Sequence, residues 1–172
     1  MRGRKNNRDF CFTHGWEGSG RLEPIEDMRR TGKLMKRHRI EYTAAWKPGP
    51  MSFWVHIEED SNQWYRAEKF SPPKPKPVTG KGYANFTVEI DNATLCFASI
   101  DEIQVCIETL SQKALPSNMI MAAKREAKSG AKYGPNNHWL NRIPLRTMAW
   151  PYRQRVVKYL KMTLRDFKRE IV

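Results

Sequence analysis

The spacing of apolar residues changes at residue 99, and this change constrains the fold more than any other feature of the chain. Before residue 99, short runs alternate between apolar and polar residues, which is the period of a β-strand. After residue 99, apolar residues recur every three or four positions, as on one face of an α-helix. Strands followed by helices predict an α+β fold, in which helices pack on an antiparallel sheet.

Five strands are expected within residues 38–98, forming one antiparallel five-stranded sheet. The last two form a hairpin through Asp91-Asn92, since both residue types tolerate left-handed backbone. Residues 71–77 contain four prolines, which cannot donate a hydrogen bond within a sheet, so an extended connection is expected there. The alternative for this segment is a docking site for an aromatic groove. The expected strands are residues 39–46, 53–57, 64–68, 83–90 and 93–97.

Four C-terminal helices are expected to pack on the sheet. The first has the clearest start, because Ser99 can cap it and the Glu102 side chain can reach back to the Ser99 N–H. The last has Pro151 at a favourable first position. The expected helices span residues 99–115, 118–128, 137–143 and 151–170. Glycines interrupt residues 1–37, which predicts a basic, partly flexible N-terminal arm before a single α+β domain at 38–172.

Charge is distributed unevenly along the chain. The net charge of +13 divides into +6 for residues 1–39, −3 for residues 40–123 and +10 for residues 124–172. Two basic ends around a mildly acidic middle are typical of a polyanion-binding protein, although a solvated basic surface with no polyanion partner is the simpler alternative. Three cysteines, no secretory signal and no long apolar run predict a cytoplasmic protein with no membrane partner.

Cations and aromatic rings are interleaved in the basic C-terminal third, which favours binding of RNA or single-stranded DNA without catalysis. Cations are expected to contact phosphates, and Tyr133, Trp139 or Trp150 to stack on unpaired bases. The predicted cationic contacts are Arg29, Arg30, Lys33, Lys36, Arg37, Lys124, Arg125, Lys128, Lys132, Arg142, Arg146, Arg153, Arg155, Lys158, Lys161 and Arg165.

Catalytic and metal-binding patterns are weak in this sequence, so no catalytic residue, metal or cofactor is predicted. Cys11 and His14 have the spacing of half a zinc site, but no second close-spaced pair accompanies them. His56 is expected on the surface of a strand. His138 has two interpretations: a helix cap, or, with Asn136 and nearby arginines, the centre of an unrecognised nuclease or transferase.

A second function remains open from the sequence. The chain also has the properties of a small regulator or inhibitor, of the phage or mobile-element type, that docks on a ribonucleoprotein or nuclease complex. Its basic surface would then face acidic protein, with residues 72–77 and exposed aromatic rings providing specificity.

Overall fold

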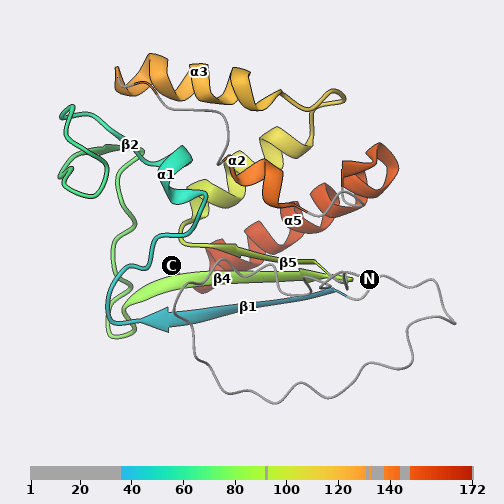
Figure 1. The fold of residues 1–172 in the computed structure, drawn as a ribbon. Coiled ribbons are helices and arrows are strands. Elements are labelled where there is room, and N and C mark those ends of the chain that lie inside the picture. The colour runs from blue at the N-terminus through green and yellow to red at the C-terminus, as the bar shows by residue number, and fades with distance from the viewer. Residues whose placement is uncertain (1–35, 92, 131, 133–137, 144–147, 172) are drawn as a thin grey trace, which may run out of the picture.

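The computed structural model describes residues 36–91, 93–130, 132, 138–143 and 148–171. Within these ranges the α+β class is confirmed, because the helices lie on one side of an antiparallel sheet (Figure 1). Lys36 and Arg37, which were predicted to end the flexible arm, already belong to the first strand. The rest of the predicted arm lies outside the described residues.

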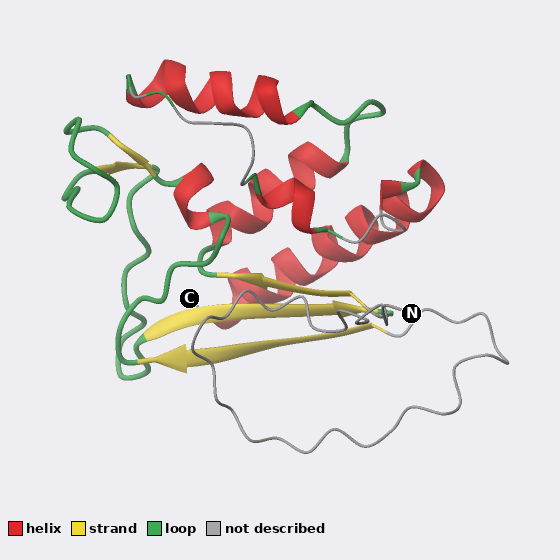
Figure 2. Ribbon diagram, viewed as in Figure 1, coloured by secondary structure: helices red, strands yellow, loops and turns green. Residues whose placement is uncertain are grey.

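The main sheet has three strands: β1 (Lys36–Thr43), β4 (Tyr83–Ile90) and β5 (Ala93–Phe97), in the order β1-β4-β5. Both neighbouring pairs are antiparallel, and Lys36 lies opposite Ile90. The expected hairpin is confirmed, and Asp91 at its turn has a positive φ of 52°. The helices cover one face of this sheet (Figure 2), and alternate residues of β4, beginning with Ala84 and Phe86, are buried.

The predicted five-stranded sheet is wrong in its first half. Residues 52–55 form one helical turn, α1 (Ser52–Val55), and the chain then pairs β2 (Ile57–Glu58) with β3 (Phe70–Ser71) in a separate two-stranded sheet. The turn forms because Ser52 donates its N–H to the Gly49 oxygen and accepts the Gly49 N–H on its hydroxyl. Alternating hydrophobicity was therefore overridden by local turn chemistry.

The predicted strand at 64–68 is also absent, because residues 64–66 form a turn. The Trp64 indole donates a hydrogen bond to the His56 oxygen at 2.8 Å, which anchors this loop on the protein. Asp60 organises the same loop by accepting backbone N–H groups, chiefly that of Glu68 at 2.9 Å. Those hydrogen bonds lower the Asp60 pKa to about 2.

Helices are present at all four expected C-terminal positions, but the first ends at residue 110 and not at 115, and the third is a short 3-10 helix. The Ser99 hydroxyl accepts the Glu102 N–H at 3.2 Å and caps the first helix as predicted. The structure assigns α2 (Ile100–Leu110), α3 (Asn118–Ser129), a 3-10 helix η2 (Trp139–Arg142) and α5 (Trp150–Glu170). Among the described helices, none is long and apolar enough to cross a membrane.

A buried polar network joins α1, α2 and the β5–α2 junction. The Glu102 carboxylate does not return to the Ser99 N–H as expected. It accepts hydrogen bonds from the Ser52 hydroxyl at 2.5 Å and the Ala98 N–H at 2.7 Å. His56 shares hydrogen bonds with the Ser99 hydroxyl and the Pro72 oxygen, both at 2.9 Å. The prediction that His56 lies at the surface is wrong, because its side chain is fully buried.

Helices α2 and α5 pack against each other and α5 crosses the inner face of the sheet, whereas α3 lies farthest from the sheet (Figure 1). The Tyr152 hydroxyl near the start of α5 donates to Asp91 at the hairpin turn, at 2.6 Å. Phe167 near its end packs on Phe86, with ring centroids 4.9 Å apart. These two contacts fix the direction of α5 across the sheet and so determine which of its side chains face solvent.

Candidate nucleic-acid interface

Helix α5 is amphipathic, and its apolar stripe explains its position. Pro151 occupies its first turn, where a missing N–H costs nothing. Val156, Leu160 and Phe167 follow at helical spacing and are buried against α2 and the sheet. The opposite side of the helix must therefore face solvent.

The solvent-facing side of α5 is strongly basic. Its exposed cations recur at intervals of three or four residues, so they form one stripe along the helix. From Arg155 to Arg169 this stripe is about 21 Å long at the rise of an α-helix. The exposed cations, here called the α5 stripe, are Arg155, Lys158, Lys161, Arg165, Lys168 and Arg169. Asp166 and Glu170 are the acidic residues of this helix.

The beginning of β1 brings one more cation to this side of the protein. The Lys36 Nζ lies 5.4 Å from the centre of the Tyr159 ring of α5. His38, two residues later, shares a hydrogen bond of 3.0 Å with the Tyr159 hydroxyl, and its Nε2 lies 3.6 Å from Asp166. Among the described residues, Lys36 therefore brings a cation from the beginning of β1 next to α5.

Arg37 and Arg39 alternate to the other face of the sheet, away from α5. Arg39 donates hydrogen bonds to Glu41 at 2.7 Å and to Glu89 at 2.6 Å, so carboxylates on the same face compensate its charge. Arg37 was predicted to contact nucleic acid, but the strand directs it to a different surface from the α5 stripe.

Arg125 does not lie on the surface, although it was predicted to contact phosphates. Its side chain is about 1% exposed, and it forms an ion pair with the equally buried Glu58 at 2.7 Å. Its Nε donates to the Phe53 oxygen at 2.8 Å, and its guanidinium lies 3.9 Å from the centre of the Phe53 ring. Arg125 therefore joins α3 to the α1–β2 segment and is not available to a nucleic acid.

Arg153 is buried as well, although its neighbours on α5 are exposed. Its guanidinium donates to the backbone oxygens of Met148, Gln112 and Lys113 at 2.6–2.9 Å. Burial lowers its pKa from the usual arginine value. Arg153 thus holds the start of α5 against the segment that follows α2, and it is not a phosphate ligand.

The remaining predicted cations are divided between exposed positions and segments outside the description. Lys124, Lys128 and Lys132 are exposed on or just after α3, and Arg142 is half-buried on η2. The predicted residues outside the described ranges are Arg29, Arg30, Lys33, Tyr133 and Arg146, together with Asn136 of the alternative catalytic site.

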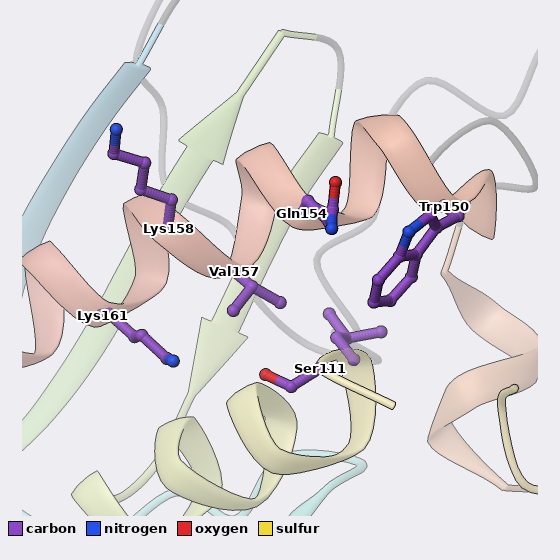
Figure 3. Close-up of a pocket in the computed structure, with 7 residues that line it drawn as sticks. Ser111, Trp150, Gln154, Val157, Lys158 and Lys161 are labelled. Atoms are coloured by element: carbon purple, nitrogen blue, oxygen red, sulfur yellow. The ribbon is translucent and has the colours of Figure 1, made fainter. Parts of the chain in front are cut away.

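The predicted aromatic contacts differ in exposure. Trp139 is only 3% exposed and belongs to the core, so it cannot stack on a base. Trp150 is half-buried and lines a shallow cleft of about 340 Å³ between the end of α2 and α5 (Figure 3). Leu110 and Ser111 form the α2 side of this cleft. No sequence pattern pointed to Leu110 or Ser111, because they are about 40 residues from α5.

His138 is a helix cap, which was one of its two predicted roles. Its Nδ1 accepts the Leu140 N–H at 3.1 Å at the start of η2. Burial lowers its pKa to about 4, so the ring is neutral at pH 7. A buried neutral cap does not favour the nuclease hypothesis. Within the described ranges, no three His, Cys, Asp or Glu side chains are grouped to hold a metal.

Comparison with protein families, with curated proteins and with solved structures returned no match to this chain.

Proposed function

We propose that this protein binds nucleic acid, RNA or single-stranded DNA, without catalysing a reaction on it. The α5 stripe is the principal contact surface, and Lys36 extends it at the edge of β1. The observation that carries this proposal is the segregation of six exposed cations onto the solvent side of one rigid, well-packed helix.

The geometry of the stripe suits a phosphate backbone. A stripe about 21 Å long can lie along several consecutive phosphates of a nucleic-acid strand. Cations held on a helix lose less freedom on binding than cations on a mobile segment. The core anchors of α5, such as Leu160 and Phe167, therefore support binding by keeping the stripe in place.

Exposed cations on α3 provide a second, weaker contribution. Lys124 and Lys128 point to solvent, while Arg125 between them points into the protein. Because α3 lies apart from the sheet and α5, a long nucleic acid is needed to contact both helices (Figure 1).

The proposal is tested by a salt titration of binding to a labelled oligonucleotide, followed by fluorescence anisotropy. If about six phosphates are engaged, affinity falls roughly 10³-fold between about 50 and 200 mM salt. A flat dependence on salt would show that phosphate contacts do not drive binding, and the proposal would be abandoned.

A matched pair of triple variants locates the surface. Lys158→Gln, Lys161→Gln and Arg165→Gln together remove three charges from the stripe. Arg66→Gln, Lys69→Gln and Lys76→Gln remove three exposed charges from the loops on either side of β3. The first set should lower the salt slope by about three and the second should leave it unchanged. Equal losses would indicate a diffuse effect of net charge.

The rival function, a regulator that docks on a nucleic-acid-processing complex, is separated by a pull-down after nuclease treatment. A partner lost on digestion is held through nucleic acid, as proposed here. A protein partner that survives digestion and is released by the stripe triple variant would instead assign the stripe to an acidic protein surface.

A further inference from the structure

The cleft between the end of α2 and α5 has properties that the stripe alone does not explain. Its volume of about 340 Å³ lies near the lower limit of the ~300–1,000 Å³ typical of small-ligand sites. Leu110, Val157 and Trp150 give it an apolar floor, while Lys158 and Lys161 lie at the other end from Trp150 (Figure 3). One site therefore combines a flat ring, an apolar surface and positive charge.

Trp150 is held in a fixed position. The Arg153 guanidinium lies 4.9 Å from the centre of its ring, and that guanidinium is itself fixed by three backbone oxygens. The tryptophan is at the first turn of α5, where the helix is anchored by Arg153. An aromatic ring already held in place loses little freedom when a second ring stacks on it, so Trp150 suits a base-stacking role.

The polar groups around the cleft are arranged for the other parts of a nucleotide. Gln154 lies one helical turn after Trp150, and its exposed amide can both donate and accept hydrogen bonds at a base edge. The end of α2 carries the negative end of a helix dipole, which favours donors such as base amino groups over phosphates. Phosphates are therefore expected at the lysine end, near Lys161, whose side chain points toward Ser111 (Figure 3).

We infer that this cleft binds one unpaired nucleotide, with its base stacked on Trp150 and a neighbouring phosphate held by Lys161. The inference rests on the proposed function and makes it more specific, because a base within a duplex is already stacked and cannot enter the cleft. The protein thus prefers single strands to duplexes, and the preference comes from Trp150.

The test compares single-stranded and duplex oligonucleotides of the same length with three variants. Trp150→Ala should weaken single-strand binding roughly tenfold, the loss typical of one stacked base, and leave duplex binding nearly unchanged. Trp150→Phe keeps a stacking ring and should retain most of the affinity. Tyr65→Ala removes an aromatic ring that is 72% exposed on a distant loop, and it should change neither affinity.

A second variant tests the cleft independently, in case Trp150→Ala does not fold. Ser111→Leu changes an exposed position on the α2 side of the cleft and narrows it without altering Trp150. It should also weaken single-strand binding selectively. A direct readout is tryptophan fluorescence, since quenching by an unlabelled single strand should be largely lost in Trp150→Phe.

The possible results separate the cleft from the stripe. If Trp150→Ala and Ser111→Leu bind single strands as wild type does, while the stripe triple variant does not, the cleft inference is wrong and the proposed function stands. If Trp150→Ala weakens single-strand and duplex binding equally, Trp150 does not select unpaired bases, and the inference is overturned. If wild-type protein shows no salt-dependent binding to either, both proposals fail.

Discussion

Two groups of arginines in this protein have opposite environments. Arg125 and Arg153 are at most 3% exposed and are bound to a carboxylate or to backbone oxygens. Arg155 and Arg165 lie in solvent on the α5 stripe. All four contribute equally to the net charge, but only the exposed pair contributes to the proposed binding surface. The net charge of the whole chain therefore overstates the charge of the proposed binding surface.

The buried group also has a structural role that the exposed group lacks. Arg125 determines which side of α3 faces inward: Ala122 and Arg125 are buried, whereas Met119 is 74% exposed. A buried ion pair stabilises a protein only when its geometry and hydrogen bonds are good. Removal of one partner then leaves an unpaired buried charge, which lowers the free energy of unfolding. Substitution of a buried arginine should therefore cause a large loss of stability, and substitution of an exposed arginine should cause none.

The largest effect is expected for Arg125→Met. It removes the guanidinium that neutralises the buried Glu58 carboxylate and should lower the free energy of unfolding by about 3–5 kcal/mol. Urea denaturation measures this loss. Adding Glu58→Leu should recover much of it, because no buried charge then remains in the pair. Lys124→Met, at the exposed neighbouring position, should change the free energy by less than about 0.5 kcal/mol; similar losses for both single variants would contradict the comparison.

The next effect is expected at Glu102, a buried carboxyl in the core network. Burial raises its pKa from 4.5 to about 7, so the folded protein binds this proton more tightly than the unfolded chain does. Its contribution to stability is fully present below pH 4.5 and is lost as pH rises through 7. Above that pH the cost to the free energy of unfolding is about 3 kcal/mol.

Glu102→Gln tests this cost directly. The glutamine amide can donate to the Ser52 hydroxyl while its oxygen accepts the Ala98 N–H, as a protonated carboxyl would. The variant should match wild type near pH 5 and exceed its stability near pH 8 in urea denaturation. A wild-type fall in stability over this range that persists in the variant would exclude Glu102 as its cause.

Arg153→Met should have a smaller effect and lower the free energy of unfolding by about 2 kcal/mol. Among the described residues, Arg153 has no buried carboxylate partner. The substitution therefore leaves only backbone oxygens without a hydrogen-bond donor. Arg155→Met is the matched control two residues later, on the exposed side of α5. Thermal unfolding of the two variants should differ clearly, and equal melting temperatures would show that the Arg153 contacts contribute little.

Local signals in the sequence predicted the helical half of the fold well. The Ser99 cap, the Pro151 start of α5 and the Asp91 hairpin turn depend on neighbouring residues, which a sequence displays directly. The strands predicted at 53–57 and 64–68 failed because hydrogen bonds that alternating hydrophobicity does not reveal, including the Ser52–Gly49 turn, hold these segments in other conformations. Arg125, 72 residues after Phe53, binds the Phe53 oxygen, and Trp64 bonds to His56.

The candidate site was predictable only where helical periodicity applied. Lys158, Lys161 and Arg165 follow the same spacing in the sequence and on the exposed side of α5. The burial of Arg153 was not predictable, because its acceptors at Gln112 and Lys113 come from a segment about 40 residues earlier. The cleft was not predictable for the same reason, because it forms only where α2 meets α5.

The smallest stability effects, and the clearest binding effects, are expected on the α5 stripe. Arg155→Gln, Lys158→Gln, Lys161→Gln and Arg165→Gln should each change the free energy of unfolding by less than about 0.5 kcal/mol, because water solvates these side chains in the folded protein. Each should nevertheless lower the salt slope of nucleic-acid binding by about one. Urea denaturation and anisotropy titrations on the same samples would give both quantities. If a stripe variant loses stability without changing the salt slope, the replaced cation has a structural role, as Arg125 and Arg153 do. That residue would then not belong to the proposed interface.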